Sequence, residues 1–537
     1  MKNIVNIVNF VRAIEPRPGR NIDMQKPVTE QIRIMKELGL KGTFLLQYDT
    51  LIDPEFHEIF ETCRDFCELG LWFEIVQAQV EAVGEKWRGR YPWDWYNDVG
   101  FLIGYEPEVR LRLIDEAMNK FKEIYGKYPD TVGSWHIDAV SLKYMQDKYH
   151  ISACCDCRDQ IGTDGYTMQG SYYNQAYYPS VNNMFCPAQT KENQITVPLF
   201  RLLGSDPMYA YDCQVIPYQL ENFNTKCATL EPAGKGQMGG DPTYCEWYYD
   251  EIFSGNGLCF QYTQTGQENS FGWPRMQVGI ESQFAIVKRL ADEGRVEVMT
   301  MGEAGKWYLS QFDMTPPATY TAFNAWQNMP YKTLWYSSRY YRTNLVWDDG
   351  VVRLRDLYVF DEKYKEFYLE KPCTTIACEY RTLPVMDGAV YCNAAKGIYA
   401  GIYLNDQNGP IKWDRFDYAE EGDHATVTLK NAQGEAIVTM SEKQITVSST
   451  IPDIRLVPVY DSDRVWGRFN TAENEYNSRN NATINLTFIS AVEAKGDDVE
   501  FLFDGYTYRV HTTKGTLASD LSVTADNGEI TLDLEQA

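Results

Sequence analysis

Residues 27–48 read PVTEQIRIMKELGLKGTFLLQY, and this stretch contains the repeating unit that decides the fold. Apolar residues recur at helical spacing over 27–40, where Pro27 stands early and Gly39 stands near the end, as in a capped helix. A short apolar run over 41–48 follows at once and predicts a buried strand. A helix that leads directly into a buried strand is typical of parallel sheets covered by helices.

The same alternation continues to about residue 303. Apolar runs predict further strands at 4–14, 71–79, 130–136, 151–157, 257–264 and 296–303. Periodic segments predict further helices at 54–70, 107–126, 140–149 and 274–294. About seven strands over about 300 residues favour a closed or nearly closed barrel over an open sheet. The fold class expected here is therefore α/β, with a (β/α)7-type parallel barrel.

From about residue 340 the pattern changes to alternation with period two. Residues 424–452, HATVTLKNAQGEAIVTMSEKQITVSSTIP, are an example, and dipeptides such as Asp349-Gly350 and Asn527-Gly528 supply turns. This pattern predicts an antiparallel β-sandwich region. We expect a barrel over 1–310, a connection over 311–340 and the sandwich region over 341–537.

Composition excludes several classes of function. The net charge of −25 disfavours nucleic acid as a partner. No apolar stretch is long enough to span a membrane, and no signal peptide is evident, so we expect a cytoplasmic protein with no membrane partner. The thirteen cysteines lack metal-site spacing, so we expect no metal and no cofactor. The sequence leaves open whether the chain forms a homo-oligomer.

Candidate site residues follow the predicted strands, because the carboxyl ends of barrel strands carry the functional groups. Two carboxylates, Asp138 and Glu268, are the candidate catalytic pair. The candidate substrate-binding residues are Glu15, Arg17, Glu74, Gln77, Trp135, His136, Asp156, Arg158, Gln267 and Glu303. Carboxylates, amides and aromatic rings suit a carbohydrate, since paired carboxylates support glycosidic cleavage and amides bind hydroxyls.

Several of these residues have a structural alternative. Asp138 is also well placed to cap the helix over 140–149. Glu74 and Glu303 are equally consistent with buried, paired structural acids. Asp156 and Arg158 are consistent with a plain salt-bridge cluster.

Four segments in order resemble the glycoside hydrolase and polysaccharide deacetylase superfamily, and most closely glycoside hydrolase family 57. They are 34–51 IMKELGLKGTFLLQYDTL, 133–138 GSWHID, 266–273 GQENSFGW and 297–309 EVMTMGEAGKWYL. The resemblance implies a (β/α)7 barrel over about residues 1–310, as in bacterial relatives of that superfamily. It places Asp138, in place of the family's Glu, as the nucleophile, and Glu268 as the general acid. Gln267 occupies the position of the family's acid, and residues 14–16 lack the family's two histidines.

The histidine inventory tests the deacetylase branch of that superfamily, whose metal is held by an Asp and two His in a His-x-x-x-His pattern. The five histidines are at 57, 136, 150, 424 and 511, and no two are four residues apart. The two imidazole ligands of such a site are therefore missing. A metal-dependent deacetylase is disfavoured on this ground.

The function expected from the sequence is a glycoside hydrolase with a two-carboxylate, retaining mechanism on a small or oligomeric saccharide. The alternatives are a carbohydrate deacetylase or lyase on the same scaffold, and a sugar-binding protein without catalysis.

Overall fold

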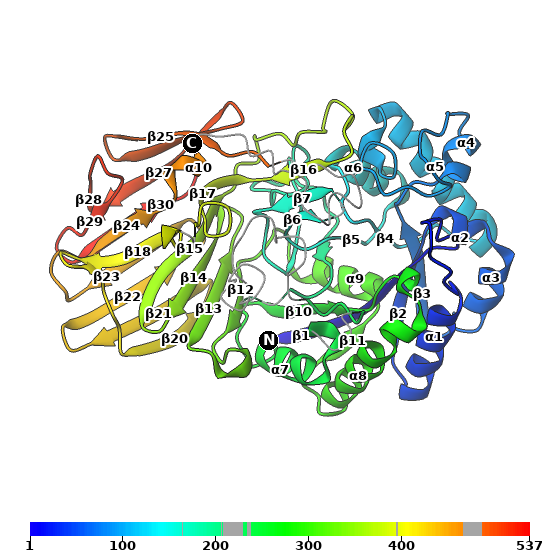
Figure 1. The fold of residues 1–537 in the computed structure, drawn as a ribbon, viewed down its shortest axis with the longest axis horizontal. Coiled ribbons are helices and arrows are strands. Elements are labelled where there is room, and N and C mark those ends of the chain that lie inside the picture. The colour runs from blue at the N-terminus through cyan, green and yellow to red at the C-terminus, as the bar shows by residue number, and fades with distance from the viewer. Residues whose placement is uncertain are drawn as a thin grey trace.

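The computed structural model describes residues 1–163, 165–205, 207, 229–233, 238–393, 396–465 and 486–536. An α/β half and an all-β half lie side by side (Figure 1). The N-terminal strands and helices form the first half, and the strands after residue 318 form most of the second.

A parallel sheet forms the centre of the first half. Its strand order is β10-β1-β2-β3-β4-β5-β9, with β8 antiparallel at the edge and β11 paired to β1. The strands are β1 (Lys2–Val11), β2 (Gly42–Leu46), β3 (Cys67–Trp72), β4 (Thr131–Gly133), β5 (Ala153–Asp156), β8 (Ala176–Tyr177), β9 (Leu199–Arg201), β10 (Phe260–Thr265) and β11 (Glu297–Met299). The sheet curves into a nearly closed barrel, as the sequence predicts. Where strands β9 and β10 come closest, the backbone N–H of Leu203 donates to Gln264 Oε1 at 3.1 Å.

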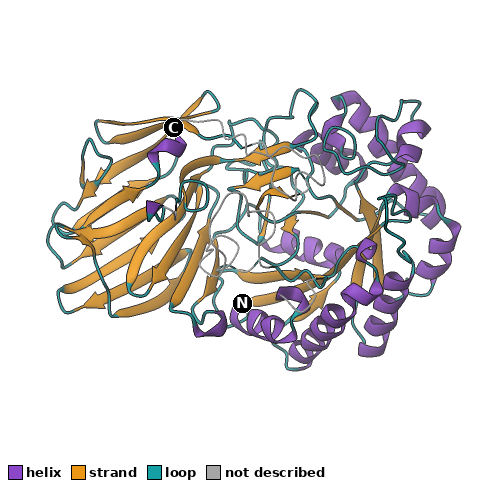
Figure 2. Cartoon of the chain, in the orientation of Figure 1, coloured by secondary structure: helices purple, strands orange, loops and turns teal. Residues whose placement is uncertain are grey.

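Helices cover the outer side of this sheet (Figure 2). They are α1 (Lys26–Leu38), α2 (Tyr48–Ile52), α3 (Pro54–Glu61), α4 (Gln77–Ala82), α5 (Pro107–Tyr125), α6 (Ala139–Tyr149), α7 (Pro242–Ile252) and α8 (Trp273–Asp292). Helix α9 (Met301–Gln311) lies inside the curve of the sheet, where Met301, Ala304 and Tyr308 share an apolar cluster with Ile4 and Val8 of β1. In α5, for example, Leu113, Ala117 and Phe121 recur at helical spacing and are buried. Burying this apolar face against the sheet stabilises both elements.

Three predicted boundaries differ most from the structure. The helix predicted over 54–70 ends at Glu61, and β3 already begins at Cys67. The strand predicted over 71–79 is therefore shifted, and its end is the helix α4. The strand predicted over 296–303 ends at Met299, because Thr300 caps α9 by accepting the N–H of Glu303.

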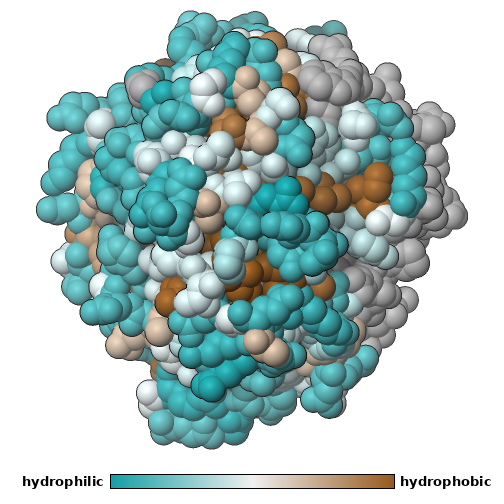
Figure 3. Space-filling model, turned by 90° about the vertical axis from the view of Figure 1, so that its left-hand side faces the viewer, coloured by the Kyte–Doolittle hydropathy of each residue, from teal (hydrophilic) through white to brown (hydrophobic). Residues whose placement is uncertain are grey.

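The second half contains two antiparallel sheets. The first sheet contains β12 (Ala318–Ala322), β13 (Tyr331–Ser337), β14 (Tyr341–Asp348), β15 (Val351–Val359), β17 (Leu383–Asp387), β18 (Gly401–Asp406), β19 (Gly409–Pro410), β24 (Arg455–Val459), β28 (Thr516–Leu517) and β29 (Val523–Thr524). The second sheet contains β20 (Arg415–Glu421), β21 (His424–Asn431), β22 (Gly434–Met440), β23 (Gln444–Ser449), β25 (Ile489–Lys495), β26 (Asp498–Phe503), β27 (Tyr506–Lys514) and β30 (Glu529–Asp533). Inward side chains of both sheets share one apolar core. Figure 3 shows the molecule from the all-β end, the left-hand side of Figure 1. This face is mostly hydrophilic, and apolar residues show in patches.

Strands and side chains of the later chain also reach the barrel half. Strand β16 (Cys378–Arg381) pairs in parallel with β7 (Tyr166–Gln169), which in turn pairs with β6 (Gln160–Thr163). In the described part of the chain, no helix combines the length and apolar character needed to cross a membrane.

Candidate functional site

The candidate site lies at the carboxyl ends of four barrel strands. Arg12 directly follows β1, Glu74 follows β3, Trp135 follows β4, and Glu268 follows β10. Because these strands are parallel and belong to the run β10-β1-β2-β3-β4 of one sheet, their carboxyl ends meet on one face. We call Arg12, Glu74, Trp135, Glu268 and Ser270 the Arg12 cluster.

Arg12 joins two carboxylates that are far apart in sequence. Its Nε and Nη2 donate to the two oxygens of Glu74 at 2.7 and 2.6 Å. Its Nη1 lies 2.6 Å from Glu268 Oε2 and donates to Ser270 Oγ at 2.9 Å. Ser270 also donates to the other oxygen of Glu268. The two-pronged contact with Glu74 fixes the guanidinium, which then orients Glu268.

Aromatic rings lie beside Arg12 and Glu74. The indole Nε1 of Trp135 donates to Glu74 Oε1 at 2.7 Å. The Trp135 ring packs edge-on against Phe10 and Trp72 at 4.9 and 5.6 Å and remains partly exposed. The guanidinium of Arg12 lies 4.2 Å from the centre of the Trp93 ring. Apolar rings beside hydrogen-bonding carboxylates are the usual lining of a saccharide site.

The charges hold Glu268 ionised. Burial raises the pKa of Glu268, but the positive charges of Arg12 and Arg17 and the Ser270 hydroxyl outweigh it, so the pKa is lowered overall. Burial lowers the pKa of Arg12, but Glu268 and Glu74 outweigh it, so the pKa of Arg12 is raised. Glu268 is therefore an anion at neutral pH, which suits a nucleophile or a charge stabiliser better than a proton donor.

Asp49 is a carboxyl group whose pKa is raised, in contrast to that of Glu268. It lies just beyond β2 in α2 and is buried, and burial raises its pKa to about 6, although nearby backbone N–H groups act against the rise. Its Oδ1 accepts the N–H of Thr50 at 2.7 Å, whereas its Oδ2 is buried without a hydrogen-bond partner among the described residues. A carboxyl group with this pKa can give or take a proton near neutral pH.

Three predicted binding residues adjoin the Arg12 cluster. Arg17 donates to Glu15 Oε1 through Nε at 2.7 Å, and its guanidinium lies 5.1 Å from the Trp93 ring that also contacts Arg12. The side chain of Gln267 accepts the N–H of Glu268 at 2.8 Å. Glu15, Arg17 and Gln267 thus belong to the same neighbourhood as Glu268.

Gln77 is held locally. It begins helix α4, and its amide donates to Glu81 one turn later at 2.8 Å. A binding role for Gln77 stays a prediction.

Asp138 has the contacts of a helix cap. Its Oδ1 accepts the N–H of Ser141 at 2.9 Å, and its Oδ2 accepts the Ser141 hydroxyl at 2.6 Å. Arg110 Nη1 lies 3.1 Å from Oδ1, and both side chains are fully buried. These contacts agree with the alternative interpretation of Asp138, in which it is the N-cap of α6. The role of nucleophile stays a prediction.

His136 is also enclosed. Its Nε2 lies 2.8 Å from Asn97 Oδ1 and 3.6 Å from the Cys378 sulfur, and its ring packs 4.2 Å from that of Phe101. Burial lowers its pKa to about 3, so the imidazole is neutral. These contacts are those of a structural histidine, and a binding role for His136 stays a prediction.

Asp156 and Arg158 belong to a buried charge network after β5. Arg201 Nη1 lies 3.2 Å from Asp156 and its Nη2 lies 2.6 Å from Asp159, which also pairs with Arg342 of the later chain. Arg158 donates to the Asp159 carbonyl oxygen at 2.8 Å. Burial raises the pKa of Asp156 to about 7 even though Arg201 acts against it. The salt-bridge alternative thus describes these contacts, and substrate binding there stays a prediction.

Glu303 lies away from the other candidates. Strand β11 pairs with the first half of β1, so α9 begins near the amino ends of the neighbouring strands. The Glu303 carboxylate is half exposed, lies 2.6 Å from Lys41 just before β2, and caps α9. The expectation that Glu303 faces the same site as Glu268 is therefore corrected: it stands at the opposite end of the barrel. The signal was present in the sequence, because Thr300 and Glu303 have the spacing of a capping box.

A deacetylase-type metal does not fit the residues present. Within the described ranges, no three His, Cys, Asp or Glu side chains are grouped to hold a metal ion. The one histidine at a strand's carboxyl end, His136, contacts Asn97 and Cys378 through Nε2, and no second histidine lies beside it among the described residues.

Comparison with known proteins identifies the fold through solved structures alone. No family model matches the sequence, and no curated protein matches it. A predicted glycoside hydrolase/deacetylase from Parabacteroides distasonis has a similar structure, with a TM-score of 0.54 and 15% identity, covering 71% of this chain and 90% of that one. At this identity the likeness shows the fold.

Two further structures are more distant. A predicted polysaccharide deacetylase from Mycobacterium smegmatis has a TM-score of 0.33 at 13% identity, covering 58% of this chain and 91% of that one. The α-amylase AmyC from Thermotoga maritima has a TM-score of 0.30 at 8% identity, covering 58% and 75%. Scores this low carry no argument about this chain.

Proposed function

We propose that this chain is a carbohydrate-active hydrolase that cleaves a glycosidic bond at the Arg12 cluster. The observation that carries the proposal is that an ionised carboxylate, Glu268, and a protonatable one, Asp49, follow β10 and β2, the two strands that flank β1 in the barrel. Two carboxyl groups whose environments push their pKa values apart are the usual acid and base of such a reaction.

In this proposal Glu268 is the nucleophile or the stabiliser of the positively charged transition state. Asp49 protonates the leaving oxygen, since its raised pKa keeps a proton available near pH 6. Arg12 orients Glu268, and Glu74 fixes Arg12.

The remaining residues of this neighbourhood bind the sugar. Glu15, Arg17 and Gln267 offer hydrogen-bonding groups to hydroxyls, and the partly exposed ring of Trp135 offers a stacking surface. The substrate class is a small or oligomeric saccharide, and the expected outcome is retention of configuration.

The resemblance to glycoside hydrolase family 57 offers a competing assignment, in which Asp138 is the nucleophile and Glu268 the acid. The contacts of both residues favour the first assignment. Asp138 is bound by Arg110 and Ser141, and the lowered pKa of Glu268 makes it a poor proton donor.

A deacetylase of the same fold is the second enzymatic candidate. The lack of a second suitably spaced histidine disfavours its metal-dependent form. A third candidate, saccharide binding without catalysis, is favoured by one observation: Arg12 already forms ion pairs with both Glu74 and Glu268.

A screen of nitrophenyl glycosides and reducing-end-labelled oligosaccharides tests the proposal. We expect hydrolysis by the wild type and loss of about 10³-fold in turnover for Glu268→Gln. Glu303→Gln makes the same chemical change at the opposite end of the barrel and should keep full turnover. Release of acetate without cleavage would support the deacetylase, and saccharide binding without turnover would support the binding protein.

A further inference from the structure

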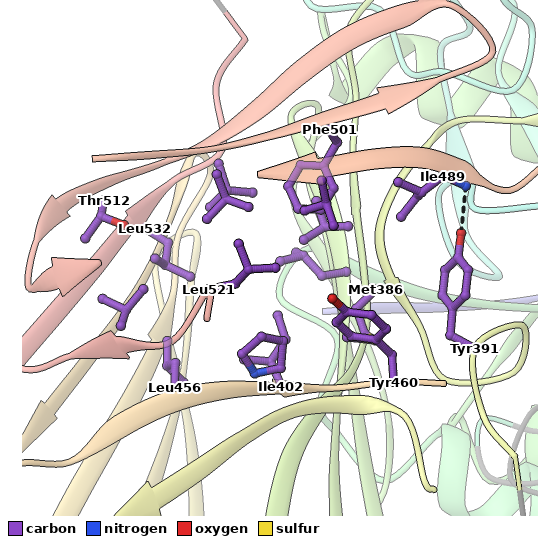
Figure 4. Close-up of a pocket in the computed structure, with 17 residues that line it drawn as sticks. Met386, Tyr391, Ile402, Leu456, Tyr460, Ile489, Phe501, Thr512, Leu521 and Leu532 are labelled. Atoms are coloured by element: carbon purple, nitrogen blue, oxygen red, sulfur yellow. Dashed lines mark hydrogen bonds between the residues drawn. The ribbon is translucent and has the colours of Figure 1, made fainter. Parts of the chain in front are cut away.

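Between the two antiparallel sheets of the second half lies a cavity of about 70 Å³ (Figure 4). One wall comes from β15, β17, β18 and β24 of the first sheet, and the other from β26, β27 and β30 of the second. The cavity is far from the Arg12 cluster in sequence, and the hydrolase proposal does not use it.

The cavity lining is almost wholly apolar. Figure 4 shows the aliphatic and aromatic side chains that surround it, among them Met386, Ile402, Leu456, Phe501 and Leu532. Cores are normally packed without voids of this size, and an empty apolar cavity lowers stability. Water is a poor occupant because apolar walls cannot satisfy its hydrogen bonds.

Three lining residues carry a hydroxyl group: Thr512, Tyr391 and Tyr460. Thr512 of β27 is 5% exposed, and its hydroxyl oxygen has no hydrogen-bond partner among the described residues. Its backbone N–H is satisfied by Asp497, so only the hydroxyl lacks a partner. The Tyr391 hydroxyl accepts the N–H of Ile489 at 3.1 Å, and Tyr460 is partly exposed. A buried hydroxyl without a partner costs about 1–3 kcal/mol.

We propose that this cavity binds a short alkyl chain that carries one hydrogen-bonding group. The apolar walls take the chain, and the Thr512 hydroxyl takes the polar group. At about 10–15 Å³ for each water-sized group, the volume accommodates roughly five to seven non-hydrogen atoms. A five-carbon alcohol therefore matches both the size and the one buried hydroxyl that lacks a partner among the described residues.

Calorimetric titration of the full chain with 1-pentanol tests the proposal, with the thermal midpoint as a second readout. We expect saturable binding of one molecule and a rise in the midpoint. Thr512→Val keeps the shape and removes the hydroxyl, so the affinity should fall about 2- to 10-fold. Thr446→Val makes the same change on β23, outside the cavity, and should bind as the wild type does.

Filling the cavity provides the complementary test. Leu456→Phe should abolish pentanol binding. If that variant does not fold, Val499→Leu, which adds one methylene, replaces it and should weaken the binding. A titration to about 10 mM 1-pentanol still detects a binding free energy of about 3 kcal/mol. If the folded wild type shows no saturable binding up to that concentration, the proposal is overturned. Equal binding by the wild type, Thr512→Val and the filled variants would overturn it as well.

Discussion

Two buried arginines in the barrel half are surrounded by carboxylates, yet their surroundings differ. Arg12 contacts Glu74 and Glu268, and side chains bind these two carboxylates: those of Arg12, Trp135 and Ser270. Arg110 contacts Asp138 and donates to backbone oxygens of residues 105, 368 and 371. We call Arg110, Asp138, Ser141 and Glu366 the Arg110 cluster.

Glu366 completes the difference between the two clusters. Its two oxygens accept the backbone N–H groups of Ala139, at the start of α6, and of Met184. The Arg110 cluster therefore ties distant backbone segments together, and moving any member would leave buried backbone groups unsatisfied. Carboxylates held by side chains alone can exchange partners for a ligand at lower cost. The same residue types thus make a structural joint in one place and a candidate site in the other.

The largest expected effect is on stability, in Arg110→Met. Removing this charge leaves Asp138 buried without its partner and frees three carbonyl oxygens, so the free energy of unfolding should fall by about 3–5 kcal/mol. Urea unfolding measures this loss. An unchanged midpoint would show that the Arg110 cluster is not a structural joint.

Arg12→Lys should affect the substrate more than the fold. Lysine keeps the positive charge but loses the two-pronged contact with Glu74, so Glu268 is no longer oriented. We expect kcat/KM to fall at least tenfold, while the free energy of unfolding falls by about 1–2 kcal/mol. If Arg12→Lys lowers the free energy of unfolding but preserves kcat/KM, the Arg12 cluster does not differ from the Arg110 cluster in the way described.

Asp49→Asn should change the pH dependence. The pKa of Asp49 is raised from 3.8 to about 6, so the folded chain holds this proton longer than the unfolded chain. The resulting stabilisation is complete below pH 3.8 and is lost as the pH rises through about 6. In the variant this decline should vanish from urea unfolding measured across that range. As the proposed acid, Asp49 should also set an alkaline limb of kcat/KM beginning near pH 6, and a limb that persists in the variant would exclude Asp49 from that role.

Trp135→Phe should have the smallest effect. Phenylalanine keeps a stacking ring but removes the hydrogen bond to Glu74, whose net contribution is about 1.5 kcal/mol for a bond to a charged group. We expect KM to rise a few-fold with kcat nearly unchanged. Steady-state kinetics separate the two, and a selective fall in kcat would place Trp135 closer to the chemistry.

The barrel was predictable because its strands are short apolar runs between amphipathic helices. Strands near 4–14, 41–48 and 151–157 and helices near 107–126 and 274–294 follow from that pattern. The carboxyl-end rule also located Glu74, Trp135 and Glu268, because parallel strands bring their ends together regardless of sequence distance.

The sequence could not predict which side chains pair with one another in the folded chain. Arg12 follows β1, and acids follow the strands β2, β3 and β10; only the folded sheet decides that Arg12 pairs with Glu74 and Glu268. The Glu366 contact to α6 joins residues more than two hundred positions apart. The raised pKa of Asp49 likewise comes from burial, which no local pattern reveals.

The most direct measurement compares two carboxyl-to-amide variants, Glu268→Gln and Asp138→Asn, on the glycan that the wild type hydrolyses fastest. The account predicts a loss of about 10³-fold in kcat/KM for Glu268→Gln with the fold intact. It predicts that Asp138→Asn keeps kcat/KM within about threefold while losing about 3 kcal/mol of stability. A stable Asp138→Asn protein without turnover, beside an active Glu268→Gln protein, would contradict it.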